Sequence, residues 1–257
     1  MMINFTIKNE SLKSLSGRVS GLLNERTALV ISFFMAITST AWFFGQDQIV
    51  AYGDAESHLN IAKRVISSLT PGFAQLGGIW LPLPHVLMIP FVYFDFLWRT
   101  GLAGSIVNGT AYIISALFIF KIGKLIFKNT VAAFIGALIF MLNLNVLYLQ
   151  ATPMTELTLM VFFVLSTYYF IKFLLEERIL DLIVAAFFGY CATISRYDGW
   201  FFVCIDILIL MIAYGPIKRL PQSFSEFSKV WDLNKWHKMQ GIVIIFTTLG
   251  FLGIVMW

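Results

Sequence analysis

The chain has 257 residues, of which 59% are hydrophobic, 16% are aromatic and only 12% carry a charge. A soluble globular domain is closer to one half apolar, so this composition excludes an ordinary water-soluble fold. The net charge of +4 comes from basic residues spread over short loops, with no basic patch that would indicate a nucleic-acid partner. We therefore expect a membrane protein.

The apolar segments are continuous rather than alternating, which predicts membrane-spanning helices and not a β-barrel. The first of them covers residues 27–44. A cleaved signal peptide is the alternative for this run, but the run is longer than the usual signal core of about 7–15 residues. We interpret it as a signal anchor that follows a polar cytoplasmic segment, residues 1–26.

Further apolar runs follow at residues 83–98, 102–120, 131–149, 157–174, 180–195, 199–215 and 241–257. Pro84, Pro90 and Asp95 make the run 83–98 a poor span, and we expect it to form an interfacial or re-entrant helix. If it does not cross, 14 of the 18 Lys and Arg residues fall in cytoplasmic segments, as the positive-inside rule favours. Those segments are 1–26, 121–128, 172–178 and 216–240.

This threading predicts an all-α, polytopic membrane protein with about seven transmembrane helices and a cytoplasmic N-terminus. Residues 27–257 form one transmembrane module, within which residues 45–98 form an outer loop with interfacial helices. The chain stops inside an apolar run at Trp257. We therefore expect a truncated product or the N-terminal part of a longer protein.

The outer loop concentrates charge in an otherwise apolar chain. Asp54 and Glu56 are two residues apart, so on a loop or a first helical turn both carboxylates can reach one point. Such a pair suits a general base beside a charge stabiliser, or hard oxygen ligands for Mg²⁺ or Mn²⁺. The alternative is that both cap the amphipathic helix predicted for residues 55–69, which would lie in the membrane interface. His58 is a candidate substrate contact in the same stretch.

Glycines and aromatic residues follow in the second half of the loop. Gly72, Gly77 and Gly78 would let backbone amides approach an anionic group. Trp80 and His85 are candidate substrate contacts at the interface. The alternatives are ordinary, because Trp is common at that depth as an anchor and a lone His is usually only hydrogen-bonded.

Two later clusters fall at helix ends on the predicted outer side, T-P-M-T-E at residues 152–156 and S-R-Y-D-G-W at residues 195–200. Glu156, just before the apolar run at residues 157–174, is a candidate site residue, and the alternative is that it caps a helix. Arg196 and Asp198 are flanked by apolar residues, where charges are costly unless they are paired or face water. One interpretation is a structural ion pair, and the other is a phosphate-binding arginine oriented by an acid.

These motifs, together with the W-L-P-L-P-H sequence at residues 80–85, resemble the GT-C superfamily of polytopic glycosyltransferases. The protein O-mannosyltransferase-like and aminoarabinose-transferase-like members are the most similar in pattern, over about residues 27–215. The resemblance implies a sugar donor on a polyprenyl or dolichyl phosphate. It also implies transfer with inversion to a lipid, glycan or protein acceptor on the outer face of the cell membrane.

The resemblance also implies roles for single residues. Asp54 would be the base or the carboxylate that orients the acceptor, with Glu56 beside it. Glu156 matches a second acidic position that helps to bind a divalent metal in some members, and Arg196 would hold the lipid phosphate as it leaves. Many members have a longer C-terminal region for acceptor binding, and we expect the truncation to have removed that region here.

Two alternatives come from other functional classes. A transporter or lipid flippase would carry its charges near the middle of the membrane, whereas the charged clusters here lie at helix ends on one side. An inactive membrane scaffold left by truncation is the other alternative.

Overall fold

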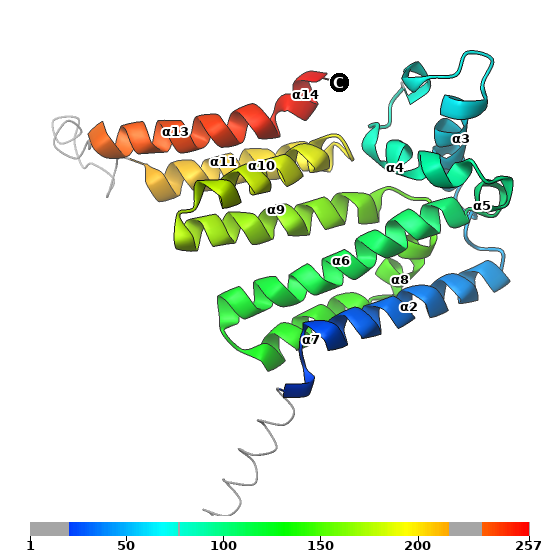
Figure 1. Ribbon diagram of the computed structural model, residues 1–257, viewed down its shortest axis with the longest axis horizontal. Helices are drawn as coiled ribbons and strands as arrows, with labels where there is room; N and C mark the ends of the chain where they lie inside the picture. The colour runs from blue at the N-terminus through cyan, green and yellow to red at the C-terminus, as the bar shows by residue number, and fades with distance from the viewer. Residues whose placement is uncertain (1–20, 77, 216–232, 257) are drawn as a thin grey trace, which may run out of the picture. The chain divides into compact units, whose positions relative to one another are not determined.

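A computed structural model describes residues 21–76, 78–215 and 233–256. Outside these residues lie most of the predicted cytoplasmic segments 1–26 and 216–240, together with Gly77 and Trp257. The described residues form helices and no strand (Figure 1). The helices are α2 (Glu25–Gly45), α3 (Gly53–Ser67), the 3₁₀ helix η1 (Phe73–Leu76), α4 (Leu83–Val92), α5 (Asp95–Thr100), α6 (Leu102–Phe127), α7 (Thr130–Met141), α8 (Leu144–Ala151), α9 (Glu156–Glu176), α10 (Ile179–Thr193), α11 (Asp198–Tyr214), α13 (Leu233–Gly250) and α14 (Leu252–Met256).

Four helical segments of the described chain are long and apolar enough to cross a membrane: α2, α6, α9 and Trp236–Met256. The pair α7 and α8 is a fifth candidate, bent by 59°. The helices α10 and α11 have 15 and 17 residues, fewer than the roughly 20 of a full crossing. The all-α polytopic membrane fold is confirmed, while the number of seven crossings stays a prediction.

The predicted run 131–149 is two helices and not one. Leu142 is the C-cap residue of α7. Asn143 is the N-cap residue of α8, because its side-chain oxygen accepts hydrogen bonds from the backbone N–H groups of Asn145 and Val146 at 3.0 and 3.2 Å. An asparagine in this position offers the backbone an alternative to continuing the helix. A single polar residue therefore breaks a run that hydropathy alone reads as continuous.

The run 83–98 is also broken, into α4 and α5, on either side of Tyr93 and Phe94. With 10 and 6 residues, neither helix is long enough to span a membrane. This agrees with the expectation that the segment is not a full crossing. Its predicted position at the membrane interface stays a prediction.

The chain forms two compact units, and each is described by itself. Unit 1 comprises Met1–Asn60 and Phe91–Leu157, and unit 2 comprises Ile61–Pro90 and Thr158–Trp257.

Unit 1 is built on α6, which packs against α2, α7 and α8. Gly123 allows α7 to approach closely, because a Cβ at this position would lie 2.8 Å from Ala133 Cα. Nearby, the ammonium of Lys121 lies 3.5 Å from the carboxylate of Glu25. The start of α2 and the end of α6 therefore lie at the same end of the unit, as the threading requires for residues 1–26 and 121–128.

The outer loop meets the opposite end of unit 1. Gly101 joins α5 to α6 with φ of 80°, a left-handed conformation that favours glycine, and a Cβ there would overlap Ile49. Tyr148, on α8, donates a hydrogen bond from its hydroxyl to the carbonyl of Gln48 at 3.0 Å. The end of α2, the start of α6 and the end of α8 thus lie together, which agrees with one predicted side for the loop and the 152–156 cluster.

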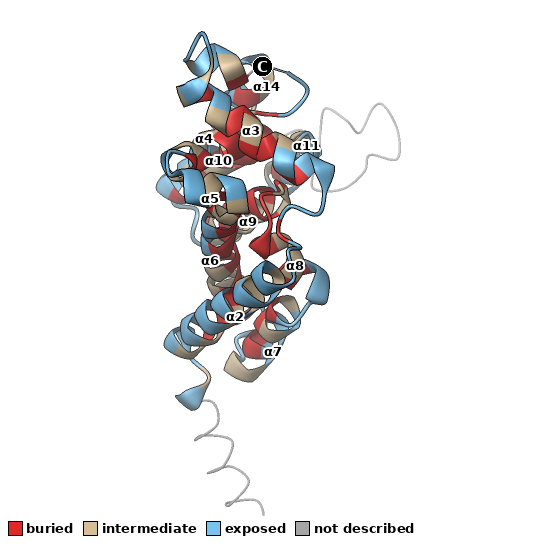
Figure 2. Cartoon of the chain, turned by 90° about the vertical axis from the view of Figure 1, so that its right-hand side faces the viewer, coloured by how far each residue is buried: buried red, intermediate tan, exposed pale blue. Residues whose placement is uncertain are grey.

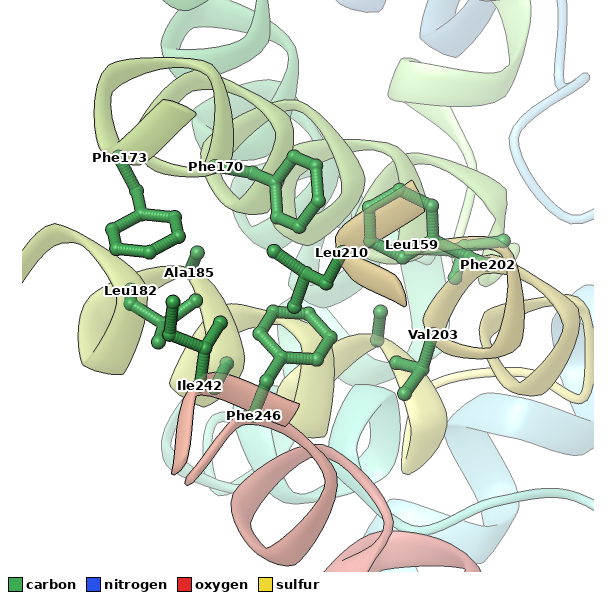
Figure 3. Close-up of a cluster of buried hydrophobic side chains, with 12 residues drawn as sticks. Leu159, Phe170, Phe173, Leu182, Ala185, Phe202, Val203, Leu210, Ile242 and Phe246 are labelled. Carbon is green, nitrogen blue, oxygen red and sulfur yellow. The ribbon is translucent and has the colours of Figure 1, made fainter. Parts of the chain in front are cut away.

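Unit 2 has its core between α9, α10, α11 and α13 (Figure 3). Phe170 and Phe246 meet edge to face with their ring centroids 5.7 Å apart, and Leu182 and Leu210 are fully buried. At one end of the unit, Lys238 donates to Glu177 at 2.8 Å and lowers the pKa of that carboxyl below its ordinary value. This ion pair joins the start of α13 to the turn between α9 and α10.

Candidate active site

Asp54 and Glu56 lie in the first turn of α3, and both side chains are exposed. Acidic residues are favoured at this end of a helix, because its free N–H groups carry partial positive charge. Successive helical residues are rotated by about 100° around the helix axis. Two carboxylates two positions apart are therefore rotated by about 200° and lie on nearly opposite sides of the helix. The helix itself therefore does not bring the two carboxylates to one point, and a shared role requires them to act from the end of the helix.

The opposite face of α3 is buried (Figure 2). Ala55, Leu59 and Ala62 on this face are less than 3% exposed, and the same face continues into unit 2 with Val65, which packs near Leu76. The predicted amphipathic helix is confirmed, with bounds two residues earlier than expected. Its apolar face is covered by the protein, and its predicted position in the membrane interface stays a prediction.

His58 belongs to this buried face, with only 2% of its surface exposed. The side chain is therefore enclosed and does not project from the loop. Beyond it, Asn60 accepts a hydrogen bond from the Trp98 indole N–H at 3.2 Å, which ties α3 to α5 within unit 1. The loop that presents Asp54 is thus anchored at both ends, by Gln48 before it and Asn60 after it.

The 152–156 turn, which precedes Glu156 at the start of α9, is held by one stretch of α6. Asn108 Nδ2 donates hydrogen bonds to the carbonyls of Thr152 (2.7 Å) and Met154, and Ser105 Oγ donates to the carbonyl of Ala151. A Cβ on Gly104 would overlap the Pro153 backbone, so the turn packs directly against the α6 backbone. Glu156 is thereby set at a fixed place in unit 1.

The other predicted loop residues lie in unit 2. Trp80 is 36% exposed, whereas His85, on α4, is fully buried. The backbone beside Trp80 is held by Tyr197, whose hydroxyl donates to the carbonyl of Ile79 at 2.7 Å. A second tie runs from the Leu83 N–H to the Ile194 carbonyl at 3.0 Å.

These ties bring the loop around Trp80 to the 195–200 turn. Arg196 and Asp198 form the ion pair that their spacing suggested, with Arg196 Nε 3.1 Å from Asp198 Oδ2. The side chains are 34% and 65% exposed, so the pair faces outward. Trp200 closes the turn by donating from its indole N–H to the Thr193 carbonyl at 3.0 Å.

The predicted site residues therefore fall into two sets. Asp54, Glu56, His58 and Glu156 belong to unit 1, and Trp80, His85, Arg196 and Asp198 belong to unit 2. Within the described chain, no group of three or more His, Cys, Asp and Glu side chains is arranged to hold a metal ion. Mg²⁺ is often bound by one or two carboxylates together with substrate phosphates. The divalent cation at Asp54 and Glu156 stays a prediction.

Sequence reasoning missed Gly104, Ser105 and Asn108. A signal was present, because an asparagine inside an apolar run of a membrane protein is costly and usually has a specific partner. The partner could not be named, because the carbonyls that Asn108 binds lie 44 and 46 residues further along the chain.

A comparison with known protein families shows which family the chain belongs to. Residues 97–225, half of the chain, match the family model described as dolichyl-phosphate-mannose-protein mannosyltransferase. The chain belongs to this family. No curated protein sequence and no solved structure matches the chain.

Membership of the dolichyl-phosphate-mannose-protein mannosyltransferase family confirms the resemblance to GT-C glycosyltransferases and identifies a multi-pass membrane protein of a glycosyltransferase family. The match includes the turns that carry Glu156, Arg196 and Asp198. It begins after the outer-loop residues Asp54 and Trp80, whose assignment rests on the motif resemblance alone.

Proposed function

We propose that this chain transfers a sugar from a polyprenyl-phosphate or dolichyl-phosphate donor to an acceptor on the outer face of the cell membrane, with inversion at the anomeric carbon. The family match over residues 97–225 is the observation that carries the proposal. The N-terminus lies in the cytoplasm, and residues 27–257 form the transmembrane module with its outer loop at 45–98. A lipid, a glycan or a protein is the acceptor class.

Asp54 acts as the general base. It is exposed at the N-terminal end of α3, on a loop fixed to unit 1 on both sides. As the acceptor oxygen attacks the anomeric carbon, its proton passes to the Asp54 carboxylate and a new C–O bond forms. The bond from that carbon to the phosphate oxygen breaks on the opposite face, and its electron pair leaves with the lipid phosphate. Glu56 supplies negative charge beside the developing positive charge on the sugar.

Arg196 binds the lipid phosphate. A guanidinium meets a phosphate with two parallel hydrogen bonds, and this interaction strengthens as the leaving group gains charge. Asp198, 3.1 Å from Arg196 Nε, orients the guanidinium. The outward exposure of this pair suits a ligand that arrives from outside unit 2, and Trp80 on the adjoining loop offers a flat apolar surface to it.

Transfer from radiolabelled polyprenyl-phosphate sugars, measured in membranes, tests the assignment. We expect Asp54→Asn to lower the rate of transfer by about 10²–10⁴-fold, because it removes the proton acceptor and leaves the side-chain volume unchanged. Glu176→Gln is the matched control, since Glu176 is an exposed acid at the C-terminal end of α9, the end opposite Glu156.

Equal transfer by the wild type and Asp54→Asn would remove Asp54 from the chemistry. Absence of transfer by the wild type would favour a transporter or an inactive scaffold. Loss of transfer in the Glu176→Gln control would show that charge removal in general, and not the base, explains the effect.

A further inference from the structure

A cavity of about 500 Å³, within the usual size range of ligand pockets, is lined mainly by α2 and α6 in unit 1. Both helices are candidate membrane spans, so we expect hydrocarbon to surround this part of the protein. Its apolar wall includes Phe33, Ala41, Phe44, Leu97, Ile106 and Ile113. The position and the wall both suit a hydrocarbon chain.

The few polar groups on the wall are mostly engaged within the protein. Thr110 Oγ1 donates to the Ile106 carbonyl at 2.8 Å, and Ser105 Oγ donates to Ala151. Gln150 Nε2 donates to Thr40 Oγ1 at 3.2 Å, and Gln150 Oε1 is a buried side-chain acceptor without a hydrogen-bond partner among the described residues. A sugar needs several convergent hydrogen bonds, so this cavity does not fit one.

A smaller pocket of about 210 Å³ adjoins the cavity, because both are lined by Phe44 at the end of α2. The cavity residues Leu97 and Leu102 also flank Arg99 and Thr100, which line the smaller pocket. The two spaces therefore follow one another from the membrane interior toward the end of α2 that carries the outer loop.

The smaller pocket contains one charge of each sign, Asp47 and Arg99. Both residues are exposed, and neither takes part in any ion pair of the described chain. The Arg99 guanidinium carbon lies 5.1 Å from the centroid of the Trp98 ring, which holds it by a cation–π contact. One carboxylate and one guanidinium are thus available in a pocket next to the apolar cavity.

We propose that these two neighbouring pockets together form a space that binds a diacyl phospholipid whose head group carries an amine. An acyl chain occupies the cavity, the phosphate pairs with Arg99, and the ammonium pairs with Asp47. Arginine is well suited to phosphate, because its planar fork forms two parallel hydrogen bonds. A head group with negative charge alone would satisfy Arg99 but would leave Asp47 beside a like charge.

This charge pattern separates the proposed lipid from the sugar donor. A polyprenyl phosphate has no cationic group for Asp47, and neither does phosphatidylglycerol. The proposal does not depend on the transferase assignment, because none of the residues that form the space takes part in the proposed chemistry. The Asp54→Asn variant should therefore bind the phospholipid as tightly as the wild type.

The test measures binding to the purified full chain in detergent micelles by native mass spectrometry. The probes are dioleoyl phosphatidylethanolamine, dioleoyl phosphatidylglycerol and a polyprenyl phosphate, titrated separately and then in competition. We expect phosphatidylethanolamine to bind with the lowest Kd. Ala41→Phe, which fills the cavity, should weaken its binding about tenfold or more, and Arg99→Gln should do the same through loss of a charge-assisted hydrogen bond.

Asp47→Asn is the sharpest variant, because asparagine tolerates the left-handed backbone (φ 55°) and removes only the charge. It should abolish the preference for phosphatidylethanolamine over phosphatidylglycerol. Ala132→Phe on α7 and Arg26→Gln at the start of α2 are controls outside the space, and both should bind like the wild type. Unchanged thermal unfolding without lipid shows that a variant is folded.

Three results would overturn the proposal. The first is equal affinity of the wild type for phosphatidylethanolamine and phosphatidylglycerol, and the second is full binding by the folded Ala41→Phe variant. The third is displacement of phosphatidylethanolamine by the polyprenyl phosphate at lower concentration, which would make the cavity part of the donor site.

Discussion

The two turns that carry the candidate charges are held in opposite ways. The 152–156 turn of unit 1 is clasped from outside by α6, through Asn108 and Ser105, and Thr152 and Thr155 are buried. The 195–200 turn of unit 2 is closed mostly by its own hydrogen bonds, and of its charged side chains Arg196 is partly exposed and Asp198 is largely exposed.

The two turns differ in whether their hydrogen bonds come from a neighbouring helix or from within the turn itself. A turn with carbonyls bound by a neighbouring helix has a fixed geometry, so a change in that helix also affects the turn. A turn with an exposed ion pair gains little stability from the pair, because exposed pairs contribute about 0.2–1 kcal/mol. We therefore expect changes near the first turn to affect folding and changes in the second turn to affect binding.

The largest expected effect is at Gly104. In Gly104→Ala the new methyl group would overlap the Pro153 backbone, which cannot move aside as a flexible side chain would. We expect the free energy of unfolding to fall by about 3 kcal/mol, the upper part of the range for overpacking. Thermal unfolding in detergent measures it. Gly136→Ala is the matched control on α7, where no atom lies within 4 Å of the added Cβ, and equal behaviour of the two variants would contradict the close approach.

The next effect in size is at Asn108. Asn108→Leu keeps the volume but removes both hydrogen bonds to the Thr152 and Met154 carbonyls. Buried carbonyls without a donor should lower the free energy of unfolding by about 2 kcal/mol. Chemical denaturation measures the loss, with Asn145→Leu on α8, an exposed position, as the control. A fully stable Asn108→Leu variant would mean that the clasp does not hold the turn.

The smallest expected change in stability is at Asp198. Asp198→Asn breaks the exposed pair with Arg196 and should lower the free energy of unfolding by less than about 1 kcal/mol. The KM for the lipid-phosphate donor should nevertheless rise, because the guanidinium loses the acid that orients it. Steady-state transfer kinetics test this, and Glu176→Gln, which breaks the exposed pair with Arg178, should change neither quantity. An unchanged KM would make Arg196–Asp198 a structural pair only.

The same contrast explains what the sequence could predict. Arg196 and Asp198 are two residues apart, so their pairing is a local property of the chain and was foreseen. The long apolar runs were foreseen for a similar reason, because hydropathy is a local average. The clasp on the 152–156 turn joins residues more than 40 positions apart, and only the packing of α6 against α8 determines it.

The break between α7 and α8 was only partly predictable from the sequence. Asn143 was visible in the run 131–149, but a polar residue within an apolar run can also remain helical and bond to a neighbouring helix. The outer-loop charges were also visible. The burial of His58 and His85 was not, because burial depends on which face of α3 or α4 meets the rest of the protein.

The boundaries between the two units have a practical consequence for anyone who would divide the gene. They fall at residues 60–61, 90–91 and 157–158, and each lies inside a helix, respectively α3, α4 and α9. Neither unit is a contiguous stretch of polypeptide, so no single start or stop codon separates them. Fragments cut at any of these places would carry an incomplete helix, and complementation by co-expressed halves should succeed only where the cut falls in a connecting loop.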